Sequence, residues 1–123
     1  MHVLIAEDEI LLRLVYEEFV ADLGHKVLVA IDGLEALELL RAGPVDVLVT
    51  DLNMPRMDGH ELLAVVAVEF PALLVIVASA YAKKMTMRDL GATGIRVHHH
   101  LVKPFDLTLL AKLLAEAERG LAP

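Results

Sequence analysis

The sequence contains no cysteine and no uncharged stretch long enough to span a bilayer. Without cysteine the chain can form no disulfide and carry no thiol chemistry, which favours an intracellular location. The longest uncharged stretch runs from Phe70 to Ala82 and contains Pro71, so it is too short for a transmembrane helix. The first acidic residue, Glu7, comes too early for a signal peptide. We therefore predict a cytoplasmic protein with no membrane partner.

Basic residues are scarce relative to acidic ones, and several enzyme motifs are missing. Eleven lysines and arginines against eighteen aspartates and glutamates leave a formal net charge of −7 at pH 7. Direct binding to nucleic acid requires an excess of basic residues, so none is expected. The chain has no glycine-rich phosphate loop, no glycine-rich dinucleotide turn and no serine elbow followed by aspartate and histidine.

Short apolar runs alternate with segments of helical spacing. The predicted strands are Val3–Ala6, Val27–Ile31, Val45–Thr50, Leu73–Ser79 and Val97–Val102. The predicted helices are Ile10–Leu23, Leu34–Ala42, a segment from Asp58 to Phe70, Lys83–Leu90 and Leu107–Arg119. Asp32 and Asp58, each followed three residues later by glutamate, predict helix starts, while Gly24 and Gly120 predict helix ends.

This alternation predicts the fold class. Each helix returns the chain to the same edge of the sheet, so successive strands lie parallel. Near-continuous apolar strands suit a sheet covered on both faces. The 123 residues, 57% of them apolar, suffice for one compact core. We predict an α/β fold, a doubly wound five-stranded parallel sheet with five helices, in a single domain over residues 1–123.

Polar residues follow the apolar runs where the predicted strands end. Glu7 and Asp8 follow the first strand, and Asp51 follows the third. Ser79 ends the fourth strand, and Lys103 follows the fifth. Ligands of open α/β sheets bind at the carboxyl ends of the strands, so these side chains are expected to converge. Clustered carboxylates favour Mg²⁺, and an aspartate can act as a nucleophile towards phosphorus while cations neutralise the phosphoryl oxygens.

Four motifs surround these residues. They are Ala6-Glu7-Asp8-Glu9, Val49-Thr50-Asp51-Leu52-Asn53-Met54-Pro55-Arg56-Met57-Asp58-Gly59, Val77-Ala78-Ser79-Ala80 and Leu101-Val102-Lys103-Pro104-Phe105. Together they resemble the receiver (response-regulator, CheY-like) domain of two-component signalling. The resemblance implies a flavodoxin-like fold with strand order 2-1-3-4-5. It also implies a signalling switch and not an enzyme, phosphorylated by a sensor histidine kinase or a phosphotransfer protein.

The resemblance implies a role for each site residue. Asp51 would accept the phosphoryl group, and Mg²⁺ would be held by Glu7, Asp8, Asp51 and the backbone carbonyl of Asn53. Lys103 would pair with the phosphoryl group, and Ser79 would turn inward to contact it. That movement would change the surface that a downstream protein binds, and a phosphorylation-dependent dimer is compatible with it. A cis peptide bond before Pro104 is frequent in the family.

Other functions remain open at this point. The acids that follow the strands also suit helix N-termini, whose dipoles they offset. An unphosphorylated interaction module, or pseudo-receiver, would not need Asp51 and Lys103, so their presence counts against it. A phosphatase with an aspartyl-phosphate intermediate would need a general acid two residues after Asp51, where the chain has Asn53.

The segment before Lys103 departs from the family pattern. An aromatic residue usually lies three positions before the lysine, but here that position is His100, within His98-His99-His100. The stretch between Gly91 and Lys103 is also longer than usual. Histidines alternating on a strand suggest a Zn²⁺ site, although a solvated edge segment is the favoured interpretation. Protonation of His100 could also bias signalling.

Overall fold

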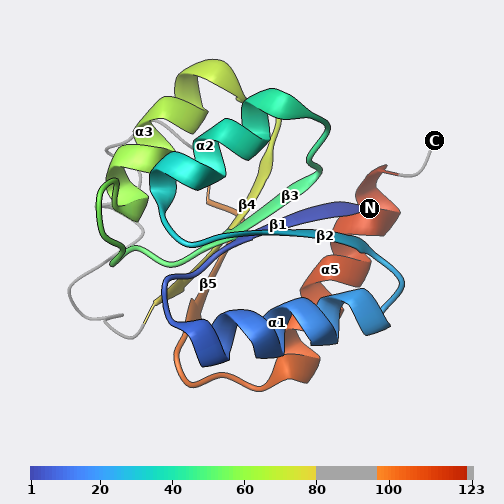
Figure 1. The fold of residues 1–123 in the computed structure, drawn as a ribbon. Helices are drawn as coiled ribbons and strands as arrows, with labels where there is room; N and C mark the ends of the chain where they lie inside the picture. The colour runs from blue at the N-terminus through green and yellow to red at the C-terminus, as the bar shows by residue number, and fades with distance from the viewer. Residues whose placement is uncertain (80–96, 122–123) are drawn as a thin grey trace.

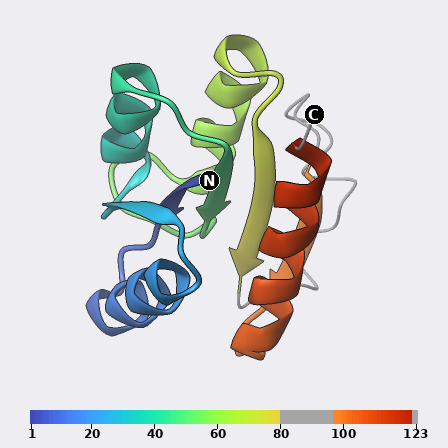
Figure 2. The same ribbon diagram turned by 90° about the vertical axis from the view of Figure 1, so that its right-hand side faces the viewer.

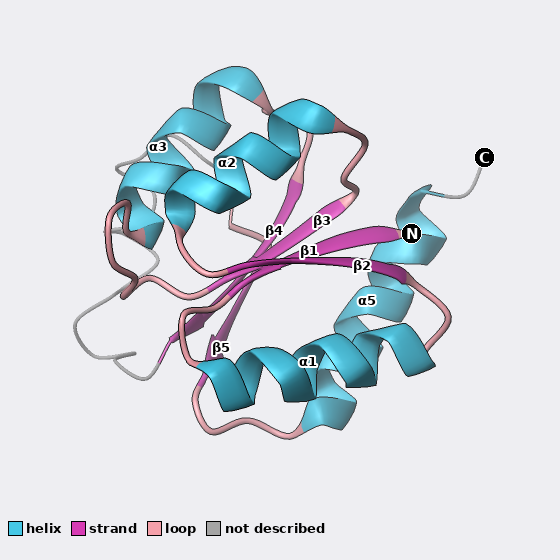
Figure 3. Ribbon diagram, in the orientation of Figure 1, coloured by secondary structure: helices cyan, strands magenta, loops and turns pink. Residues whose placement is uncertain are grey.

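The chain folds as a parallel sheet with helices on both faces (Figures 1 and 3). The computed structural model describes residues 1–79 and 97–121. The strands are β1 (His2–Ala6), β2 (Lys26–Ala30), β3 (Val47–Thr50), β4 (Leu74–Ser79) and β5 (His99–Val102). The helices are α1 (Ile10–Asp22), α2 (Gly33–Ala42), α3 (Gly59–Glu69) and α5 (Leu107–Leu121). The sheet has five strands in the order β2-β1-β3-β4-β5, which confirms the predicted class and strand order.

The helix boundaries follow local hydrogen bonding, with one correction to the sequence prediction. Asp32 caps α2 by accepting a hydrogen bond from the Glu35 amide at 2.8 Å. Asp58 forms a complete capping box at the start of α3. Gly24 follows α1 with a φ of +95°, as expected of a glycine helix stop. The prediction that Gly120 ends the last helix was wrong, because α5 continues to Leu121.

Two apolar cores hold the layers together, one on each face of the sheet. Figures 1 and 2 show α2 and α3 on one face and α1 and α5 on the other. The first core joins the sheet to Leu37 of α2 and Leu62 of α3, and the second joins it to Val20 of α1 and Leu110 of α5. The central strands β1, β3 and β4 therefore bury both faces, as their continuous apolar sequences predicted, whereas the edge strands β2 and β5 are partly exposed.

The predicted helix Lys83–Leu90 lies outside the described residues. Ala80, Tyr81 and most of the lengthened segment before Lys103 also lie outside them. No helix in residues 1–79 and 97–121 combines the length and the apolar content that crossing a bilayer requires.

Candidate functional site

The register of the parallel sheet brings the predicted site residues together at the carboxyl ends of the strands. Ala6 of β1 lies beside Thr50 of β3, so the residues that follow them, Glu7 and Asp51, leave neighbouring strands together. The Asp51 amide still continues this ladder, donating to the Ala6 carbonyl at 3.0 Å. At the other side of the site, the Lys103 amide donates to the Ser79 carbonyl at 2.9 Å. The strand pairing thus extends one residue beyond the strands and fixes the main-chain positions of Asp51 and Lys103.

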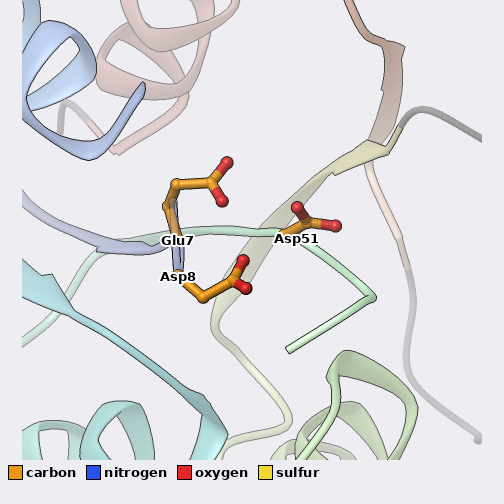
Figure 4. A group of neighbouring side chains, drawn as sticks. All are labelled: Glu7, Asp8 and Asp51. Carbon is orange, nitrogen blue, oxygen red and sulfur yellow. The ribbon is translucent and has the colours of Figure 1, made fainter. Parts of the chain in front are cut away.

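Glu7, Asp8 and Asp51 form an acidic cluster. Each offers a carboxylate oxygen, and these oxygens lie within 4.8 Å of one another. Figure 4 shows the carboxyl groups turned towards a common space, with Asp51 entering from the end of β3. Glu7 is buried, Asp51 is half-buried and Asp8 is exposed, so the cluster opens towards solvent on the Asp8 side. Three converging carboxylate oxygens with an open side are a donor set that suits Mg²⁺, which prefers oxygen ligands and retains waters.

Lys103 links the two inner acids. Its Nζ donates to Asp51 Oδ2 at 2.8 Å and also forms a short ion pair with Glu7 Oε1. Burial alone would lower the pKa of Lys103, but hydrogen bonds to Asp51 and Glu7 outweigh it and raise that pKa above its ordinary value. Burial raises the pKa of Glu7, and the hydrogen bond from Lys103 only partly offsets this effect. The ammonium therefore remains charged where negative charge has gathered.

Main-chain amides fix the orientation of the Asp51 carboxyl group. Its Oδ1 accepts hydrogen bonds from the Leu52 amide at 2.6 Å and from the Asn53 amide at 3.1 Å. Its Oδ2 faces Lys103. Thr50, which is fully buried, donates its hydroxyl to the Asp51 carbonyl at 2.8 Å. The carboxylate is thus held in one orientation, with one oxygen on the loop and the other directed to the cation.

Ser79 lies where the sequence predicted it, buried at the end of β4 beside Val102. Its inward movement towards a phosphoryl group stays a prediction. The same is true of the Asn53 carbonyl as a metal ligand, although the loop that carries it follows Asp51 directly. The Lys103–Pro104 peptide bond is cis, as the resemblance implied.

The sequence did not reveal three contacts that support the site. Arg13 of α1 donates to the Glu7 carbonyl at 3.0 Å and thereby fastens the loop after β1. Tyr16 stacks on Phe105 with ring centroids 5.7 Å apart, which packs α1 against the loop after Lys103. An ion pair between Asp32 and Arg56 joins the loops after β2 and β3. A basic residue one turn into α1 was the only signal for the first contact; the other two join residues far apart in sequence.

In the described part of the chain, the histidine run belongs to no group of three or more potential metal ligands. Within residues 1–79 and 97–121, the acidic cluster is the one group of potential ligands close enough to share an ion. His98 precedes β5, and its Nδ1 accepts a hydrogen bond from the Val75 amide at 3.1 Å. His100 lies in β5 beside Val77, and its buried Nε2 has no hydrogen-bond partner in the described part of the chain. A pH effect of His100 on signalling stays a prediction.

Comparisons with known proteins agree with this geometry. A family model described as response regulator receiver domain matches residues 3–115. Chemotaxis protein CheY-3 of Vibrio cholerae is 35% identical over 117 residues, which cover 93% of this chain and 88% of CheY-3. Response regulator RR06 of Streptococcus pneumoniae is 35% identical over 112 residues, which cover 91% of this chain and 50% of RR06.

Among solved structures, the chemotaxis response regulator CheY4 of Vibrio cholerae has a TM-score of 0.84 and 29% identity. The match covers 94% of this chain and 97% of CheY4. Other relatives are longer, since this chain spans 50% of RR06 and 25% of the response regulator protein FleR of Pseudomonas aeruginosa.

Proposed function

We propose that this chain, which belongs to the response regulator receiver domain family, is a switch that accepts a phosphoryl group on Asp51. The observation that carries the proposal is the Asp51 carboxylate, oriented by two main-chain amides and paired with the Lys103 ammonium beside two further acids. We extend the proposal to a single receiver domain over residues 1–123. The cytoplasmic location stays a prediction from the sequence.

In this mechanism the chain supplies orientation and charge. The Leu52 and Asn53 amides hold Asp51 Oδ1, so rotation of the carboxylate costs nothing further at the moment of attack on phosphorus. Glu7, Asp8, Asp51 and the Asn53 carbonyl would hold Mg²⁺, which when bound neutralises charge on the phosphoryl oxygens. Lys103 already lies against Asp51 and would stay paired with the new phosphoryl group.

Phosphorylation would change the interactions of Glu7 and Asp51. The phosphoryl group carries about −1.5 to −2 charges in place of the single negative charge of the Asp51 carboxylate, so the net negative charge of the site rises by up to about one. Lys103 would then face a more highly charged anion than Glu7, and the Ser79 hydroxyl would donate to a phosphoryl oxygen. A conformation that makes these contacts more favourably is stabilised relative to the other conformations by the difference in contact free energy, so its population rises. A surface change read by a downstream protein, with or without dimerisation, would follow from this shift.

The surface beside the site suits a protein phosphodonor. Ile10, Leu11, Leu14 and Val15 expose large apolar side chains on the first two turns of α1. A groove of about 490 Å³ continues from Val15 and Tyr16 to Lys103 and Phe105. An exposed apolar patch of this kind is typical of a protein interface. We propose that a sensor histidine kinase or a phosphotransfer protein docks here and presents its phosphohistidine to Asp51.

The test is incubation with acetyl phosphate and Mg²⁺, followed by intact mass measurement. We expect one phosphoryl adduct that is lost in Asp51→Asn and after chelation with EDTA. Asp46→Asn is the matched control, because Asp46 is an aspartate that precedes β3, at the amino ends of the strands and away from the site. Absence of an adduct on the unaltered protein, at any Mg²⁺ concentration, would refute the proposal and favour the pseudo-receiver. Continuous release of phosphate from phosphomonoesters would favour the phosphatase.

A further inference from the structure

The loop that orients Asp51 is fastened at its far end to a different part of the chain. We call residues 52–58 the acceptor loop; its first two amides hold Asp51 Oδ1. Towards its end, the Met57 carbonyl accepts a hydrogen bond from the Gly33 amide at 3.0 Å. The side chain before it, Arg56, donates through Nε to Asp32 Oδ2 at 2.6 Å. Both attachments are to the start of α2, so the acceptor loop is held at both ends.

The ion pair between Arg56 and Asp32 is built around a buried charge. The Asp32 side chain is 2% exposed, whereas that of Arg56 is 57% exposed. Asp32 uses its other oxygen to cap α2, so both carboxylate oxygens have partners. A buried carboxylate that loses its cation raises the free energy of the folded state, so the ion pair is strongly favoured over the separated side chains. The guanidinium hydrogen bond holds the pKa of Asp32 below its usual value.

The backbone of Arg56 indicates that the pair determines the shape of the loop. Its φ of +65° lies in the left-handed region, where an arginine is disfavoured relative to glycine. Within residues 1–79 and 97–121, it is the one non-glycine residue with positive φ. A residue persists in such a conformation when its surroundings determine it, and here the guanidinium reaches Asp32 from that backbone.

We propose that Arg56 is a positioning residue for phosphoryl transfer, acting through its ion pair with Asp32. By fastening the acceptor loop to α2, the pair keeps the Leu52 and Asn53 amides on Asp51 and the Asn53 carbonyl at the metal site. This inference rests on the proposed function. Arg56 pairs with Asp32 and is not one of the residues proposed to hold the phosphoryl group or the metal, so its effect is on the geometry of the loop and not on the chemistry itself.

The first experiment compares Arg56→Met and Asp32→Asn with the unaltered protein. Arg56→Met keeps most of the side-chain length, and Asp32→Asn keeps an oxygen for the α2 cap, so each removes the ion pair with little else. We expect the Mg²⁺ dissociation constant, measured by titration calorimetry, to rise about tenfold, as for the loss of groups that orient metal ligands. Without Mg²⁺, hydrogen exchange of the Leu52 and Asn53 amides should accelerate. The double variant should resemble the single variants.

Arg41→Met is the matched control. Arg41 of α2 pairs with Glu69 of α3, and its side chain is 53% exposed, close to the value for Arg56. This pair also joins two segments, but it lies at the other ends of α2 and α3, away from the acceptor loop. Arg41→Met should leave both the Mg²⁺ affinity and the exchange of the two amides unchanged.

Two further variants separate the ion pair from the backbone strain. Arg56→Gly relieves the positive φ but loses the pair, so it should weaken Mg²⁺ binding as Arg56→Met does. Arg56→Lys keeps a cation, so its Mg²⁺ affinity and amide exchange should be closer to those of the unaltered protein. Wild-type Mg²⁺ affinity and amide exchange in Arg56→Gly would overturn the proposal. If the unaltered protein bound no Mg²⁺, the proposed function would fail, and amide exchange alone would decide whether Arg56 positions the loop.

Discussion

Gly59 is the position where one added methyl group tests the site geometry most directly. It is the first residue of α3, and its amide donates to the Leu52 carbonyl at 2.9 Å. A Cβ at this position would lie 2.5 Å from the Asp51 carbonyl oxygen and 2.6 Å from Leu52 Cα. Both are main-chain atoms, so no side-chain rotation relieves the contact. Gly59→Ala must therefore displace either the start of α3 or the backbone of Asp51.

The expected magnitude follows from these distances. Cβ contacts under 3.0 Å are essentially never observed, so a contact of 2.5 Å requires a shift of at least 0.5 Å. Overpacking of this kind costs about 1–3 kcal/mol, while alanine favours the helix by up to about 1 kcal/mol. We expect a net loss of about 1–2 kcal/mol in the free energy of unfolding. Since a 1 Å misplacement can slow a reaction by about 100-fold, phosphorylation should slow by about tenfold.

Urea unfolding and the initial rate of phosphorylation by acetyl phosphate measure the two effects. The control is Gly120→Ala within α5, where an added Cβ meets no atom within 4 Å. That variant should gain up to about 1 kcal/mol in stability through helix propensity and retain the original phosphorylation rate. If Gly59→Ala matched Gly120→Ala in both measurements, the close packing of α3 on Asp51 could not be what positions the acceptor.

Two further predictions concern charge. Lys103→Met leaves the Glu7 and Asp51 carboxylates facing each other without a cation. Urea unfolding at pH 8 should therefore show a loss of about 3 kcal/mol in the free energy of unfolding without Mg²⁺, and a smaller loss with Mg²⁺. Equal losses in the two conditions would mean that Lys103 and the metal do not neutralise the same acids. The Arg56 hydrogen bond lowers the folded-state pKa of Asp32. The Asp32 carboxylate therefore stabilises the fold at pH values above its ordinary pKa of 3.8, and this contribution is lost as the pH falls through the lowered pKa. Asp32→Asn should therefore be less stable than the original protein at pH 6, with the difference vanishing in strong acid; a difference constant with pH would contradict this assignment.

Most of the fold was predictable from local pattern. The apolar runs located all five strands to within two residues, because the central strands β1, β3 and β4 are buried on both faces and the edge strands β2 and β5 still turn apolar residues towards the cores. The prediction failed at Gly120, which lies within α5 and does not end it. A glycine inside a helix costs only about 1 kcal/mol, and Leu110, Leu113 and Leu114 anchor α5 in the second core, so packing outweighs the local preference.

The site was predictable to the extent that it depends on strand ends. Parallel strands place their carboxyl ends at one edge, so Glu7, Asp51 and Lys103 had to converge once the strands were located. The pairing of Lys103 with both acids was not predictable, because it depends on distances across the edge that no spacing in the sequence specifies. The Asp32–Arg56 pair was missed for the same reason, since its partners belong to loops after different strands.

By itself, the sequence determined the strands, the caps of Asp32 and Asp58, and the residues that leave the strand ends. These features arise from interactions among near neighbours and from burial, which a one-dimensional pattern records. Only the tertiary structure decided that Lys103 lies between two acids and that Arg56 fastens the acceptor loop to α2. Such contacts join residues from separate loops, and their geometry exists only when the packed sheet and helices have set the loops side by side.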